Sequence, residues 1–81
     1  AAEQGYAKAQ YNLGLMYYKG QGVLQYYAGA YIWFNLAAAN GNEAGKEYRD
    51  LSAEEMTSDQ IAEAQKLARE MVEANPKLMG E

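Results

Sequence analysis

The chain has 81 residues, contains neither cysteine nor histidine, and carries a net charge of −4. A chain of this length forms one small domain, with a core that is marginal unless it is idealised or shared. The absence of cysteine excludes disulfides and cysteine-type zinc sites. No set of nucleophile, base and orienting group is available either, so we expect no catalytic residues, no metal site and no cofactor.

Charged residues are concentrated in the second half of the chain, because residues 1–40 carry only Glu3, Lys8 and Lys19. No basic patch is available to neutralise phosphates, so we expect no nucleic-acid partner. No apolar run has the length of a membrane span or the form of a secretion signal, so we expect no membrane partner. The first residue is Ala1 rather than Met, which favours a fragment or a processed product and leaves the compartment undetermined.

Residues 6–18 have the periodicity of a helix with two faces that are both at least partly apolar. We expect one face to pack in the core, because an apolar stripe normally packs inward. Its members are Ala9, Leu13, Met16 and Tyr17. The nearly opposite face consists of Lys8, Tyr11, Leu15 and Tyr18.

A turn and a second helix follow. In the turn, residues 19–22, we expect Gly20 and Gly22 to supply a positive φ at the end of the first helix. Residues 25–40 are apolar nearly all round, which predicts a helix that is buried on several sides. Trp33 and Phe34 are its largest apolar side chains, and burying each contributes on the order of 2 to 3 kcal/mol. We interpret both as core residues rather than as binding hot spots.

A repeat motif runs through these two helices. Leu13-Gly14-x-x-Tyr17 and Ala30-x-x-x-Phe34 fit the skeleton of tetratricopeptide-type repeats. Gly14 removes a side chain, so that a neighbouring helix can approach. Ala2-Glu3-Gln4-Gly5 is also paralleled by Ala38-Ala39-Asn40-Gly41, and the two glycines are 41 − 5 = 36 positions apart. Together with Gly20-Gln21-Gly22-Val23 and Tyr31-x-Trp33-Phe34, residues 2–41 resemble the Sel-one-like repeat.

The second half of the chain is interpreted as the end of such an array. Residues 42–56 form a degenerate second repeat, since a shift of 36 places Arg49 and Asp50 opposite Leu13 and Gly14. Residues 57–75 begin with a capping box and form a capping helix, and residues 76–81 are a tail. This last helix has a single apolar stripe, which consists of Ile61, Ala64, Ala68, Met71 and Val72.

The resemblance implies an all-α fold over residues 1–81: a right-handed α/α solenoid of helix-turn-helix repeats, with about four helices and the last one as a C-terminal cap. It also implies a binding scaffold that has no chemistry of its own. On this interpretation a protein or peptide partner binds a concave groove formed by Lys8, Tyr11, Leu15 and Tyr18. A missing preceding helix that once covered the same face is the alternative.

A second hypothesis is that the chain is homo-oligomeric, because a single helical hairpin cannot cover both of its faces. Leu24 and Tyr26 depart from what the family would place there, and both add apolar surface. The expected self-association surface is therefore Leu24, Tyr26 and Tyr27. A third hypothesis is an engineered or truncated module that has no ligand of its own.

Overall fold

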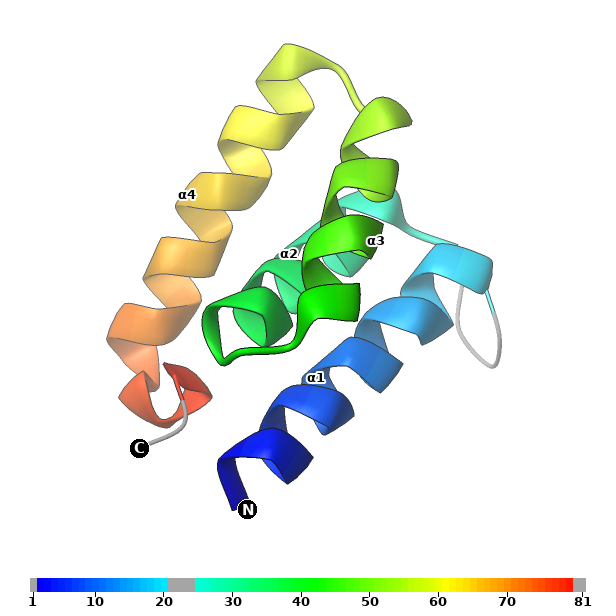
Figure 1. Cartoon of the computed structure of the whole chain (residues 1–81). Coiled ribbons are helices and arrows are strands. Elements are labelled where there is room, and N and C mark those ends of the chain that lie inside the picture. The colour runs from blue at the N-terminus through cyan, green and yellow to red at the C-terminus, as the bar shows by residue number, and fades with distance from the viewer. Residues whose placement is uncertain (1, 21–24, 80–81) are drawn as a thin grey trace.

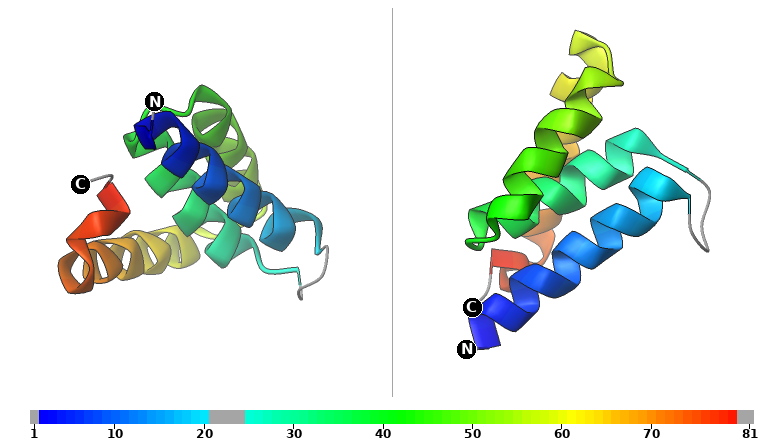
Figure 2. Two further views of the ribbon diagram at one scale, coloured as in Figure 1. Left: turned by 90° about the horizontal axis from the view of Figure 1, so that it is seen from below. Right: turned by 45° about the vertical axis from the view of Figure 1, so that its right-hand side comes forward.

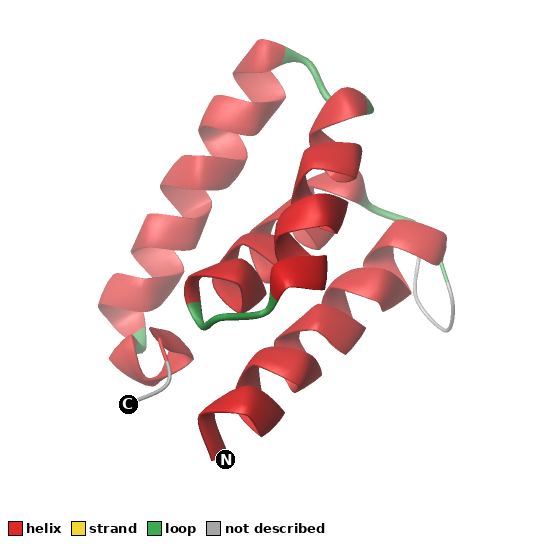
Figure 3. Ribbon diagram, viewed as in Figure 1, coloured by secondary structure: helices red, strands yellow, loops and turns green. Residues whose placement is uncertain are grey.

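The computed structural model describes residues 2–20 and 25–79, and within them every regular element is helical. Four α-helices, α1 (Ala2–Lys19), α2 (Tyr27–Ala39), α3 (Glu43–Glu54) and α4 (Ser58–Ala74), are followed by a short 3-10 helix, η1 (Pro76–Met79) (Figures 1 and 3). The all-α prediction with four helices is confirmed. The first helix extends past the expected residues 6–18 at both ends, and the second is shorter than expected.

The helices α1 and α2 form a hairpin whose turn begins at a glycine with positive φ. Gly20 has a φ of 72° and donates its backbone N–H to the Met16 carbonyl oxygen at 2.8 Å. Tyr26 donates its backbone N–H to the Tyr17 carbonyl oxygen at 3.0 Å, so the chain returns alongside the end of α1. The expected role of Gly20 is confirmed, because only glycine adopts this φ without strain. Gly22 lies outside the described residues.

The second helix is the centre of the molecule, and α1, α3 and α4 all pack against it (Figure 2). Phe34 and Ala30 are fully buried. Tyr31, Ile32 and Leu36, on other sides of the same helix, form a core cluster with α4. The prediction of a helix buried on several sides is therefore confirmed. Trp33 packs at the edge of this cluster and is only half-buried.

Two glycines bring the helices into close contact. A Cβ atom on Gly14 would lie 2.6 Å from Cδ1 of Phe34, which confirms that this position needs glycine for α1 to approach α2. A Cβ atom on Gly45 would lie 3.0 Å from the Phe34 carbonyl oxygen and 3.0 Å from Cβ of Ala37. The crossing of α3 over α2 therefore depends on a second glycine, and the sequence analysis did not assign this role to Gly45.

The expected core face of α1 is partly wrong. Ala9 is exposed and Met16 is 37% exposed, whereas the buried residues of α1 include Ala7, Gln10 and Gly14. The reason is that α1 crosses α2 at Gly14, so the side of α1 that carries Ala7, Gln10 and Gly14 faces α2. Among the described elements, none covers the side that carries Ala9 and Met16. Leu13 and Tyr17, the other expected core residues, are half-buried.

The capping helix α4 packs on α2 through the expected stripe. Its capping box is confirmed, since Thr57 Oγ1 accepts from the Gln60 backbone N–H at 3.1 Å and Gln60 Oε1 accepts from the Thr57 backbone N–H at 2.9 Å. Ala64 and Ala68 are buried against residues of α2. The helices α3 and α4 diverge from the loop that joins them (Figure 1).

The segment after α4 is held against the first hairpin by amide side chains. Gln10 Nε2 donates to the Leu78 carbonyl oxygen at 2.8 Å, and Asn40 Nδ2 donates to the same oxygen at 2.9 Å. Asn40 Nδ2 also donates to Gln10 Oε1 at 2.8 Å. Gln10 is only 3% exposed, so these bonds satisfy a buried amide. Residues 76–79, expected as a tail, are therefore docked onto α1 and α2.

Candidate functional site

Three tyrosines from two helices pack around the Phe34 ring and a fourth packs on one of them; we call the four the tyrosine cluster: Tyr11, Tyr18, Tyr48 and Tyr27. The ring centroids of Tyr11 and Tyr18 lie 5.8 and 6.1 Å from that of Phe34. The Tyr48 centroid lies 5.5 Å from Phe34, 5.7 Å from Tyr11 and 5.8 Å from Tyr18. Tyr27 joins the cluster through Tyr18 at 5.7 Å. Four of these six pairs are edge-to-face, an arrangement that aromatic rings prefer, and the other two are tilted.

The tyrosine cluster is both core and surface. Phe34 is fully buried, whereas each of the four tyrosines is only half-buried. Each therefore keeps part of its side chain accessible while packing against its neighbours. Tyrosine suits a binding surface of this kind, because a held ring presents apolar area and a hydrogen-bonding group with little loss of conformational entropy.

Carboxylates lie near the phenol groups. Burial raises the pKa of Tyr11, and the neighbouring Tyr48 and the Glu47 carboxylate raise it further. Burial also raises the pKa of Tyr18, with smaller contributions from Tyr27, Glu55, Tyr48 and Glu54. The three glutamates are exposed. The accessible part of the cluster is therefore an aromatic surface beside negative charge.

These pKa shifts predict a loss of stability in alkali. Because the pKa values of Tyr11 and Tyr18 are higher in the folded chain, the unfolded chain loses its phenol protons first as the pH rises. The contribution of these two phenols to the free energy of unfolding is then fully present below about pH 10, the unfolded pKa. It is lost as the pH rises from there through the folded pKa values. Urea titrations at several alkaline pH values measure this fall. The double variant Tyr11→Phe with Tyr18→Phe should show a shallower fall, and an equally steep fall would contradict the assignment.

The other residues expected in the groove flank the cluster on α1. Lys8 is exposed and Leu15 is half-buried, and both lie at positions next to Tyr11 and Tyr18 on the helix surface. The structure thus brings Tyr11 and Tyr18 together through Phe34 and Tyr48. Tyr48 is the member that the sequence analysis did not select. It lies in residues 42–56, which were interpreted as a degenerate repeat because the repeat motif is lost there.

Two of the three expected self-association residues, Tyr26 and Tyr27, lie within the described residues. Leu24 lies outside the described residues. Tyr27 belongs to the tyrosine cluster, whereas Tyr26 is 51% exposed and makes an edge-to-face contact with Tyr17 at a centroid distance of 6.3 Å. Both Tyr26 and Tyr27 line a concavity of about 460 Å³ beside the start of α4.

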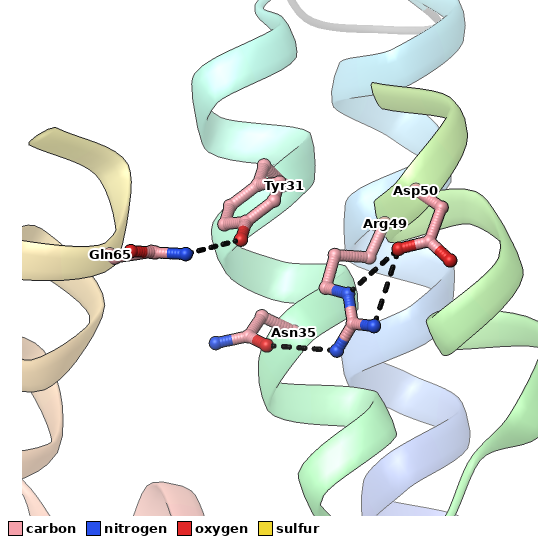
Figure 4. Close-up of polar contacts among 5 residues, drawn as sticks. All are labelled: Tyr31, Asn35, Arg49, Asp50 and Gln65. Carbon is pink, nitrogen blue, oxygen red and sulfur yellow. Dashed lines mark hydrogen bonds and ion pairs between the residues drawn. The ribbon is translucent and has the colours of Figure 1, made fainter. Parts of the chain in front are cut away.

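A larger hollow lies between the diverging helices α3 and α4, and we call it the arginine groove. Its volume is about 700 Å³, and it is lined by residues of α2, α3, α4 and η1 that include Asn35, Arg49, Gln65 and Arg69. Figure 4 shows Arg49 of α3 directed toward Asn35 of α2, and Gln65 of α4 reaching Tyr31 of α2. The groove was not predicted from the sequence, where Arg49 indicates a degenerate repeat and no opening between the last two helices is expected.

Within the described residues, no group of three or more acidic, histidine or cysteine side chains is placed to hold a metal ion. Among the helices that these residues form, none is both long enough and apolar enough to cross a membrane.

Comparison with solved structures finds a clear similarity. The chain is similar to c5321, a protective antigen present in uropathogenic Escherichia coli strains whose crystal structure displays an SLR fold. The two sequences are 34% identical, the TM-score is 0.80, and the match covers 98% of this chain. The same match spans 17% of the c5321 chain. No family model matches the sequence, and no curated protein matches it.

Proposed function

Since this chain has the SLR fold, that of the Sel-one-like repeat, we propose that it is a non-catalytic protein-binding module whose tyrosine cluster receives a peptide segment. The single observation that supports this proposal most directly is the cluster itself. Three half-buried tyrosines of α1 and α3 pack around the fully buried Phe34, and a fourth, from α2, packs on Tyr18. Rigid aromatic side chains that are partly open to solvent are typical anchors of protein interfaces.

The surroundings of the cluster suggest the chemistry of the partner. Glu47, Glu54 and Glu55 are exposed and act on the phenol groups, whereas Lys8 is an exposed cation on the same side of α1. Three carboxylates against one ammonium favour a segment that carries positive charge. We therefore propose a peptide with apolar side chains for the tyrosine rings and at least one lysine or arginine for the glutamates.

A selection from a displayed library of random 12-residue peptides tests this proposal. We expect the 81-residue chain to enrich peptides that are apolar and basic. Binding of the enriched peptides, measured by fluorescence anisotropy, should fall about 10-fold or more in Leu15→Ser and should weaken in Tyr18→Phe, because hot-spot contacts are worth about 2 kcal/mol or more. Tyr18→Phe keeps the ring that packs on Phe34, so it tests the surface without opening the core.

Met16→Ser is the matched control, because Met16 lies on the side of α1 that faces away from α2 and is also partly exposed. It should leave the affinity for these peptides unchanged. The proposal fails if no apolar, basic peptide is enriched, or if Leu15→Ser and Met16→Ser have equal effects on binding.

Self-association is the second candidate function, and the exposure of large apolar side chains favours it. Tyr26 is 51% exposed and Met16 is 37% exposed, although both are apolar enough to be buried in an interface. Light scattering across a concentration series should then show a mass above that of the monomer, and Tyr26→Asp should restore the monomer. A mass that stays monomeric at all concentrations would exclude this function.

A further inference from the structure

The arginine groove has a mainly apolar interior. Leu36 and Ala68 are buried residues in its lining, and Ala53 and Val72 are half-buried beside them. These residues come from α2, α3 and α4, so the interior of the groove exists only because α3 and α4 diverge while both remain next to α2. A volume of about 700 Å³ lies within the range of sites that hold a small ligand or a few side chains of a peptide.

Arg49 is the most buried charged group in this lining. Its side chain is 26% exposed, whereas Arg69, Asp50 and Glu73 are all exposed. A charge away from bulk water is screened less than a charge at the rim. A ligand that enters the groove therefore meets the positive charge of the Arg49 guanidinium, and Arg69 on the opposite wall adds a second positive charge.

The Arg49 guanidinium is only weakly held by its present partners. Its Nε and Nη2 atoms both lie 3.3 Å from Asp50 Oδ1, and Nη1 lies 3.4 Å from Asn35 Oδ1 (Figure 4). All three contacts are longer than usual for hydrogen bonds that involve a charged group. Asp50 is the next residue in the chain, and its side chain is 65% exposed, so this ion pair contributes little to stability. A carboxylate from outside can replace it with a bidentate pair.

We propose that the arginine groove is a second peptide-binding site, specific for a segment that carries an aspartate or glutamate next to aliphatic side chains. The ligand carboxylate pairs with Arg49 and Arg69, and its aliphatic neighbours pack on Leu36, Ala68 and Val72. The Gln65 and Asn35 amides, which also line the groove, hydrogen-bond the peptide backbone. This site lies on residues that the tyrosine cluster does not share, and it prefers the opposite charge.

The same displayed library tests this proposal separately from the first. We expect a second class of enriched peptides, acidic and aliphatic, whose affinity falls about 10-fold or more in Arg49→Gln and about as much in Arg69→Gln. Arg69 is exposed, so Arg69→Gln is expected to fold even if Arg49→Gln does not. Replacing the acidic residue of the peptide by its amide should weaken binding to the unchanged chain by a similar factor. Circular dichroism confirms that each variant is folded before its affinity is interpreted.

Two controls separate the sites. Lys66→Gln removes an exposed cation of α4 that is not part of the groove lining, and it should leave the affinity of the acidic peptides within about twofold. Leu15→Ser should weaken the basic peptides and spare the acidic ones. The proposal is overturned if no acidic peptide is enriched, or if acidic peptides bind Arg49→Gln and Arg69→Gln as tightly as the unchanged chain. Neither result bears on the tyrosine cluster, which is tested separately with the apolar, basic peptides.

Discussion

Replacing Phe34 by alanine is expected to remove about 3 to 5 kcal/mol from the free energy of unfolding, because the ring is fully buried and its loss leaves a cavity. A domain of this size has a total stability on the order of 4 to 12 kcal/mol. The loss is therefore a large fraction of the total, and the variant should unfold at a much lower urea concentration than the unchanged chain. Three tyrosine rings pack directly on Phe34, so the tyrosine cluster should be lost with it. Urea denaturation followed by circular dichroism at 222 nm is the measurement.

Phe34→Leu is the matched control, since it keeps an apolar side chain in the same space and leaves a smaller cavity. It should remain folded and lose clearly less stability than Phe34→Ala. A loss below about 1 kcal/mol in Phe34→Ala would contradict the packing described above, because such a value is typical of surface positions.

Gly14→Ala is expected to destabilise the chain by about 1 to 3 kcal/mol, although alanine favours a helix more than glycine does. The new Cβ atom would lie 2.6 and 2.7 Å from Cδ1 and Cε1 of Phe34. That ring cannot move away, because Tyr11, Tyr18 and Tyr48 pack around it. The hairpin of α1 and α2 must open instead, which should appear as a lower urea midpoint.

Gly29→Ala is the variant with which the stability change of Gly14→Ala should be compared. Its Cβ atom would lie 2.7 Å from Cδ2 of Tyr26, a distance almost as short as that at Gly14. Tyr26 is 51% exposed and can rotate into solvent, so the gain in helix propensity of about 1 kcal/mol should dominate. Gly29→Ala should be neutral or stabilising. If the two variants lose the same stability, the rigidity of the Phe34 ring is not the deciding factor.

Most of the fold prediction was based on the repeat motif. Gly14 and Phe34 were identified from their spacing, and the structure places them in direct contact. The resemblance to the Sel-one-like repeat is confirmed by an SLR-fold neighbour that matches 98% of the chain. The capping box at Thr57 and Gln60 was equally readable, because it depends on residues three positions apart.

The candidate sites were less predictable, because each depends on residues from different helices. Tyr11 and Tyr18 were selected from the periodicity of one helix, but Tyr48 joins them only through the crossing of α3 over α2. The assignment of Ala9 and Met16 to the core was wrong for a related reason. The buried side of α1 carries Ala7, Gln10 and Gly14 and lies between the two partly apolar faces, and periodicity alone cannot say which side a neighbouring helix covers.

The sequence by itself determined the four helices, the glycine-dependent approach of α1 to α2, and the absence of cysteine and histidine chemistry. These follow from composition and from the spacing of residues along the chain, and neither depends on how the helices pack. Only the tertiary structure decided which face of α1 is buried, how three tyrosines of two helices meet around Phe34, and that α3 and α4 diverge to leave Arg49 and Arg69 beside one groove. The physical reason is that these features arise from the packing of helices that are distant in the chain, and their crossing geometry depends on all of their contacts at once.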